Sequence, residues 1–317
     1  MEGMVKQILE IILVPLIAFI VGLFLLGLAR KVIARIHWRY GPPITQPVID
    51  IIRFFSQRSV SHGGMFNMGI ILSLAASFAV VLFLPFGVFT PLAGSGGLLV
   101  ILYIMIIAPI GIAFSSGEGA NPNISIGISR KLILSFGYEV PLLLILLSVM
   151  THYGTISIVD IVKAQEAGNW ALFSWPLVLP GIAYFLILPA MLGLRPFDVA
   201  SALQEISSGP QVEYGGRFLA LVTIEHGLAI FITIGLFVDL FLGGGGLWHG
   251  AGSFLYSGPG AILTPVVFLI KMLVVFLLGL FVHSVFPRFR VEQALRYLWR
   301  WPTAFALVGL VIVMIAK

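Results

Sequence analysis

Cysteine is absent from this 317-residue chain, and charged residues are scarce, at 10% of the total. Without thiolates, the chain cannot ligate an iron–sulfur cluster through cysteine, form a disulfide or use a cysteine nucleophile. A soluble globular domain carries about 25% charged residues, so the low charge excludes that class. What the chain has in abundance is apolar residues, which make up 59% of it and give a mean hydropathy of +1.09.

Several apolar windows are long enough to cross a bilayer, because about 20 helical residues span about 30 Å of hydrocarbon. The sequence therefore predicts an all-α, polytopic integral membrane protein, with one membrane domain over residues 1–317 and about eight transmembrane helices. The predicted spans are 8–29, 66–89, 97–114, 131–152, 174–194, 217–242, 259–285 and 299–316.

Basic residues gather on one side of the predicted bilayer. Of the 18 Lys and Arg residues, 14 lie in or beside the four connections on that side, which are 30–65, 115–130, 195–216 and 286–298. The positive-inside rule assigns this side to the cytoplasm of a cell-membrane protein and places both termini outside. Since the basic residues serve topology, the net charge of +5 does not indicate nucleic-acid binding.

Two further segments are predicted to be helical without crossing the membrane. In residues 44–59, apolar side chains recur at helical spacing with Asp50 and Arg53 opposite them, which predicts an amphipathic helix at the cytoplasmic interface. Residues 155–167 are a weaker candidate on the outer side. The Gly-rich run 243–252 is predicted to be a flexible outer loop.

An acidic island interrupts the apolar sequence between Arg195 and Arg217. It holds Asp198, Glu205 and Glu213, and carboxylates kept at a membrane face indicate a role that uses charge. A structural role is the alternative, because Arg195 and Asp198 are three residues apart and their pairing at a helix end also accounts for both.

Carboxylates also lie inside two predicted spans. Glu139 and Glu225 each follow a basic residue, Lys131 or Arg217, by eight positions. Eight helical residues rise about 12 Å, so both glutamates are expected at similar depth, where they could share a proton or an ion. His226 and Lys271 would extend such a path sideways, although Lys271 could also simply snorkel. Asp239 is expected to be a solvated residue at the outer boundary, and the scattered histidines predict no metal site.

Two longer motifs resemble a known family. The first contains Arg30-Lys31, Arg39-Tyr40-Gly41-Pro42 and Gln46-Pro47. The second contains Arg195-Pro196-Phe197-Asp198, Gln204-Glu205 and Glu213-Tyr214. Both, in this order, resemble the signatures of the membrane subunit that joins the two arms of respiratory complex I. The resemblance covers essentially the whole chain.

The chain departs from the quinone-reducing members of that family. Residues 199–203 are Val-Ala-Ser-Ala-Leu where those members carry further acidic residues, and 206–210 are more similar to the hydrogenase-type members. The resemblance therefore implies a membrane-bound NiFe hydrogenase or the related archaeal sulfur-reducing complex. It implies a soluble iron–sulfur small subunit and a hydrogenase-like large subunit on the cytoplasmic face, which would hold the iron–sulfur clusters and the NiFe centre, and antiporter-like and small membrane subunits in the surrounding lipid.

From these features we expect a membrane-anchoring, ion-coupling subunit of a redox-driven pump, with no redox centre and no cofactor of its own. The segments 30–65 and 195–216 are expected to dock the redox subunits. The expected ion-coupling residues are Asp198, Glu205, Glu213, Glu139, Glu225 and Lys271, and the expected docking residues are Arg30, Lys31, Arg35, Arg39, Arg53, Arg195 and Arg217. A quinone-linked complex I subunit and a stand-alone ion antiporter stay open as alternatives, as does the choice between proton and sodium.

Overall fold

The computed structural model describes residues 2–92, 96–119, 121–247 and 263–316. In these ranges the chain is built from helices and contains no β-strand, which confirms the all-α prediction. The long helices are α1 (Glu2–Ile36), α3 (Gly64–Phe83), α4 (Leu98–Ser116), α5 (Pro122–Tyr153), α7 (Val178–Met191), α9 (Arg217–Phe241), α11 (Leu263–Val285) and α12 (Val291–Ala316).

Seven of the described helices are long and apolar enough to cross a membrane, and these are all of the long helices except α7. A 3-10 turn, Trp175–Leu177, precedes α7, so that the shorter apolar helical stretch runs over Trp175–Met191. The prediction of about eight spans is confirmed. Two helices, α1 with 35 residues and α5 with 32, are longer than the predicted spans. Helices of that length exceed the roughly 30 Å thickness of the hydrocarbon layer, so their ends continue beyond it.

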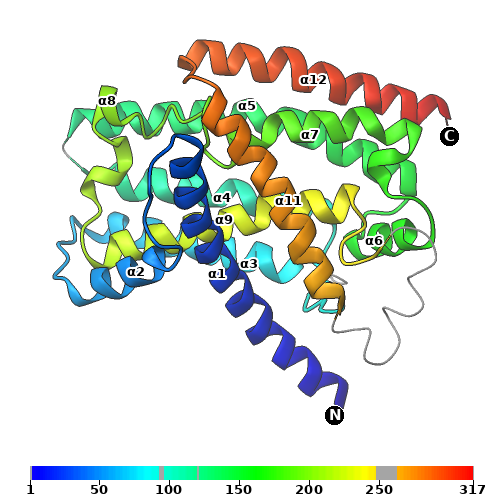
Figure 1. Cartoon of the computed structure of the whole chain (residues 1–317), viewed down its shortest axis with the longest axis horizontal. Helices are drawn as coiled ribbons and strands as arrows, with labels where there is room; N and C mark the ends of the chain where they lie inside the picture. The colour runs from blue at the N-terminus through cyan, green and yellow to red at the C-terminus, as the bar shows by residue number, and fades with distance from the viewer. Residues whose placement is uncertain (1, 93–95, 120, 248–262, 317) are drawn as a thin grey trace.

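The helices form a bundle around α9 (Figure 1). Helix α12 lies along α5 and α7, α3 pairs with α4, and α1 and α11 cross the bundle obliquely. In α9, 78% of the most apolar stretch is buried, against 28% to 50% for the other candidate spans. A helix that is apolar on every side and surrounded by others is a core element.

Glycines allow the helix backbones to approach one another. A Cβ atom built on Gly22 of α1 would lie 2.4 Å from the carbonyl oxygen of Gly227 in α9. One built on Gly69 of α3 would lie 2.5 Å from the carbonyl oxygen of Gly111 in α4. Membrane helices associate through van der Waals contact, so small residues at these crossings stabilise the bundle.

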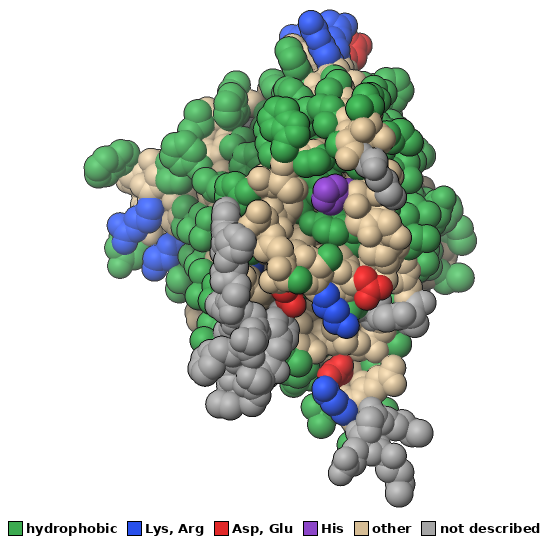
Figure 2. Space-filling view, turned by 90° about the vertical axis from the view of Figure 1, so that its right-hand side faces the viewer, with side chains coloured by type: hydrophobic (Ala, Val, Ile, Leu, Met, Phe, Trp, Pro, Cys, Tyr) green, Lys and Arg blue, Asp and Glu red, His purple; other side chains and the backbone are tan. Residues whose placement is uncertain are grey.

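The two predicted non-spanning helices are confirmed, at opposite ends of the bundle (Figure 1). Helix α2 (Gln46–Ser56) has a proline in its first turn and buries Pro47 and Ile51, while Arg53 is exposed. Helix α6 (Ile158–Ala167) begins at Ser157, whose side chain accepts a hydrogen bond from the backbone of Asp160. Hydrophobic side chains cover much of the end that carries α6, and acidic and basic side chains gather near its middle (Figure 2).

Candidate functional site

A cavity of about 260 Å³, with both apolar and ionisable residues in its lining, lies between the helices. Residues of α3, α4, α5, α7 and α9 line it, together with the segment that follows α7. Small residues of its lining include Ala76, Ser77, Ala108, Ala190 and Ala229. These side chains are too short to fill the space between the helix axes, and Pro109 removes a backbone hydrogen bond from α4 at the same place. The result is a chamber that polar side chains enter.

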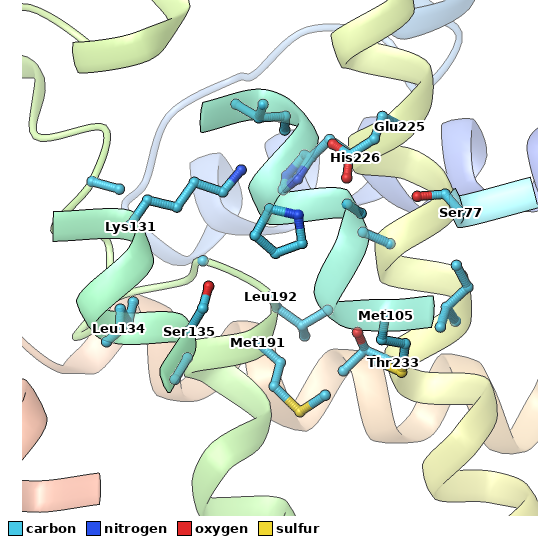
Figure 3. A pocket seen from close by; sticks show the side chains of 18 of the residues that line it. Ser77, Met105, Lys131, Leu134, Ser135, Met191, Leu192, Glu225, His226 and Thr233 are labelled. Carbon is cyan, nitrogen blue, oxygen red and sulfur yellow. The ribbon is translucent and has the colours of Figure 1, made fainter. Parts of the chain in front are cut away.

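Three ionisable side chains line the membrane-spanning part of the cavity. Lys131 reaches from α5 toward His226 and Glu225 on α9 (Figure 3). Lys131 and Glu225 attract each other electrostatically, and only 9% of Glu225 is exposed. Two opposite charges held in one low-dielectric chamber are sensitive to any charge that arrives nearby. The geometry therefore suits the relay of a cation between ionisable groups.

The sequence predicts Lys131 to lie beside a cytoplasmic connection, and in the structure its side chain lines the cavity. Helix α5 begins at Pro122, nine residues earlier, and the Asn121 side chain caps it by accepting a hydrogen bond of 3.0 Å from the amide of Asn123. Asparagine followed by proline is a helix-start signal, and it would have placed Lys131 inside the helix. Glu139 is half-buried on the same helix and is not among the cavity-lining residues, so among the described residues the structure does not bring it together with Glu225 in the cavity.

The end of the cavity toward α8 (Leu203–Ile206) is lined by Asp198, Ser201 and Tyr214. Asp198 accepts a hydrogen bond of 2.9 Å from the guanidinium of Arg288 and another from the Ser201 hydroxyl. The backbone amide of Arg195 donates to His283 Nδ1 at 2.8 Å. The carboxylate of Asp198 is thus bound by the connection between α11 and α12, in place of the considered pairing with Arg195.

The two other carboxylates of the island are also bound by distant segments. Glu205 accepts a hydrogen bond of 2.8 Å from Arg130, and Glu213 lies 2.9 Å from His62 Nε2. The hydrogen bond from Arg130 holds the pKa of Glu205 below its ordinary value, despite the opposing effect of desolvation. The three carboxylates of the island, Asp198 included, thus bind one basic connection each, in 286–298, 115–130 and 30–65.

Tyr214 closes the cavity beside Glu213. Its ring packs against Phe66, with the centroids 5.5 Å apart, and its hydroxyl donates to the carbonyl of Ile112 at 3.4 Å. Burial raises the pKa of Tyr214 above its ordinary value. The hydroxyl is consequently a hydrogen-bond donor throughout the physiological range.

The expected docking residues lie around the same end of the bundle, beside α2 and α8 (Figure 1). Arg30 pairs with Asp50 at 3.1 Å, and Arg35 lies over the ring of Tyr40 at 5.0 Å. Next to them Trp38 is 98% exposed. The residues of the set that are mostly exposed are Arg30, Arg35, Arg39, Arg53, Arg195 and Arg217, and Lys31 is half-buried.

Lys271 does not line the cavity and occupies a second polar cluster near α6. Asp239, its neighbour there, is fully buried. The prediction of a solvated Asp239 was wrong, because the glycine loop after α9 folds back over the end of that helix. Within the described parts of the chain, no three or more His, Asp or Glu side chains are grouped so that they could hold a metal ion.

Comparison with known proteins finds a matching family and several relatives that agree with it. A family model described as NADH dehydrogenase matches residues 9–314. A subunit of the NADH-quinone oxidoreductase of Neisseria meningitidis serogroup C is 32% identical, covering 94% of this chain and 86% of that protein. A subunit of the F(420)H(2) dehydrogenase of Methanosarcina mazei is 29% identical, covering 92% and 88%.

A solved structure is also similar. A chain of the membrane-bound sulfane sulfur reductase, described as an archaeal respiratory membrane complex, matches with a TM-score of 0.90 and 37% identity. The match covers 97% of this chain and 99% of that one. The similarity therefore extends over nearly the whole length of both chains.

Proposed function

The chain belongs to the NADH dehydrogenase family, and from that membership we propose that it anchors a redox module to the membrane and couples its reaction to ion movement. The redox module would be of membrane-bound hydrogenase or sulfur-reductase type. The single observation that carries the proposal is the cavity, which joins Asp198 at one end to Lys131 and Glu225 within the membrane.

The cavity supports a coupling mechanism based on charge. A redox event in a partner subunit changes the charge near Asp198, whose carboxylate is balanced by Arg288. A cation then moves along the cavity to Glu225, where the ammonium of Lys131 sets the balance between the charged and neutral forms. His226 lines the same path. Glu139 would extend this path toward the other face of α5.

We assign the end of the bundle with α2 and α8 to the cytoplasm and both termini to the outer side. This orientation rests on the excess of basic residues in the connections at that end. The segments 30–65 and 195–216 would dock a soluble iron–sulfur subunit and a large subunit of hydrogenase type, which would carry the iron–sulfur clusters and the NiFe centre. Antiporter-like and small membrane subunits would contact the lipid-facing helices.

The lining of the cavity favours a hydrogenase-like complex over a quinone-linked one. Ala200 and Ser201 line the cavity in the segment where quinone-reducing members carry further acidic residues. A complete acidic relay from a quinone site is therefore absent from this segment. Assays of the purified complex with protons, polysulfide and quinone as acceptors decide between the alternatives.

The deciding experiment for coupling is the ion-to-electron ratio of the intact complex in sealed vesicles. Glu225→Gln keeps the size of the side chain and removes its titratable charge, so we expect assembly with a sharply lower ratio. Electron transfer in detergent should be affected less, since the redox centres would lie in partner subunits. Glu139→Gln tests the extension of the path, and Glu292→Gln, at an exposed position of α12, is the matched control. A normal ratio in Glu225→Gln would contradict the proposal.

A further inference from the structure

A buried ammonium group occupies a cage of carbonyl oxygens at the α6 end of the bundle. Lys271 Nζ donates to the carbonyls of Leu242 at 2.6 Å and Gly244 at 2.9 Å, and also to that of Gly246. Only 8% of Lys271 is exposed, and its Nζ lies 4.5 Å from the centre of a Trp170 ring. An ammonium group has three donors, and here each has an acceptor.

The cage is built by the backbone that follows α9. Gly243 and Gly244 have φ angles of +67° and +54°, a left-handed conformation that side chains with a Cβ rarely adopt. The turn closes through hydrogen bonds from Gly244 to the carbonyl of Val238 and from Gly246 to that of Gly243. Gln165 of α6 fixes the end of α9 by donating to two further carbonyls, at 2.9 and 3.1 Å. The carbonyls of the cage are therefore held in place by packing on two sides.

Asp239 supplies an unsatisfied carboxylate to the same place. It is 0% exposed, and neither of its carboxylate oxygens has a hydrogen-bond partner among the described residues. A Cβ atom built on Gly244 would lie 3.1 Å from Asp239 Oδ1, so the carboxylate rests against the residue whose carbonyl binds Lys271. Buried polar atoms without partners are rare in folded proteins. The two carboxylate oxygens of Asp239 are therefore available to bind a ligand.

Charge counting indicates which ligand fits. Lys271 interacts electrostatically with two carboxylates, those of Asp239 and Glu166. A monovalent cation that takes the place of the ammonium leaves the net charge of this buried cluster unchanged. A divalent cation in the same place would change that charge by one unit, in a medium of low dielectric constant. Oxygen atoms from carboxylates and backbone carbonyls are the ligands that hard metal cations prefer.

We propose that Asp239 and the carbonyls of Leu242, Gly244 and Gly246 form a sodium site, in which Na⁺ binds in place of the tethered ammonium of Lys271. Lys271 acts as a built-in competitor that keeps the cage formed when Na⁺ is absent. This is a binding property of the Lys271 cluster near α6 and does not depend on the ion coupling proposed for the cavity.

Binding of ²²Na⁺ to the purified intact complex tests the proposal, with N-methylglucamine chloride holding the ionic strength constant. Asp239→Asn removes the anionic ligand and should weaken the site at least tenfold. Lys271→Met removes the competitor at similar length and should strengthen it at least tenfold. Glu292→Gln, at an exposed position in the first turn of α12, should leave binding unchanged and controls for the loss of a carboxylate.

Isotherms that stay unchanged in both Asp239→Asn and Lys271→Met would overturn the proposal. Weaker Na⁺ binding in Lys271→Met would also overturn the proposal, since Lys271 would then favour Na⁺ binding and would not compete with it. If Lys271→Met does not assemble, Lys271→Arg replaces it. A planar guanidinium cannot direct three donors at three converging carbonyls, so this variant should also raise the affinity for Na⁺, and an unchanged affinity would contradict the competition.

Discussion

Asp198 and Arg288 lie 2.9 Å apart across 90 residues of sequence, and their ion pair fastens the loop after α7 to the connection between α11 and α12. Both side chains are mostly buried, with 17% and 19% of their surface exposed. The Nε atom of Arg288 is buried and has no hydrogen-bond partner among the described residues. The pair therefore connects two segments at the end of the cavity, while one hydrogen-bond donor of Arg288 stays without an acceptor among the described residues.

The first prediction concerns this pair. Arg288→Gln or Asp198→Asn leaves one mostly buried charge without its partner, which should lower the free energy of unfolding by about 1–3 kcal/mol. The double variant should lose less than the sum of the two single variants. Thermal unfolding of the purified complex, read as a double-mutant cycle, measures the coupling, and additive losses would show that the pair is not coupled.

The second prediction concerns pH. Because the hydrogen bond from Arg130 lowers the pKa of Glu205 in the folded protein, the pair stabilises the fold above the ordinary carboxyl pKa. That contribution should be lost only as the pH falls through the lowered folded-state pKa. Arg130→Gln should return the pKa toward its ordinary value. Isotope-edited infrared titration of the carboxylate band, with Glu205→Gln for subtraction, follows this residue. Identical titrations with and without Arg130 would contradict the assignment.

The third prediction concerns the opposite charges in the cavity. Lys131→Met removes the opposite charge that attracts Glu225 across the cavity and should destabilise the complex. Because the two side chains are not in ion-pair contact, the loss should stay below the roughly 3 kcal/mol expected when a contacting buried pair loses one partner. Adding Glu225→Gln should recover part of that loss, because both charges are then gone. Both variants should pump fewer ions per electron. Recovery of stability without recovery of pumping separates the structural role of the pair from its functional role.

The fourth prediction concerns the crossing of α1 and α9. Gly22→Ala places a methyl group 2.4 Å from the carbonyl oxygen of Gly227, and neither backbone can move far in a packed bundle. We expect a loss of about 1–3 kcal/mol, as for other overpacked cores. Gly215→Ala is the matched control, because a Cβ atom there has no neighbour within 4 Å. Equal unfolding temperatures for the two variants would contradict the close contact.

The fifth prediction concerns docking. A photo-cross-linking amino acid in place of Trp38, which is 98% exposed beside several arginines, should capture the redox subunits in membranes. The same probe in place of Lys163, an exposed residue of α6 at the opposite end, should not. Capture from Lys163 alone would reverse both the orientation and the docking surface.

The fold class and the number of spans could be predicted from the sequence. The free energy of transferring a helix into a bilayer is nearly the sum of the contributions of its consecutive residues. Proline and periodicity placed α2, and a serine cap marks the start of α6. The family signatures include the acidic island, whose role in coupling stays a prediction. Each of these features is local in the chain.

Which ionisable side chains lie together was decided by the tertiary structure alone. Glu139 and Glu225 follow their basic residues by the same eight positions, yet only Glu225 lines the cavity. Spacing along a helix fixes depth in the membrane, whereas the rotation of each helix in the bundle decides which side chain faces the cavity. The partners of Asp198 and Lys271 come from segments that the chain brings together only when the helices pack. Hydrophobicity therefore determined where the chain crosses the membrane, and helix packing determined which charges meet inside it.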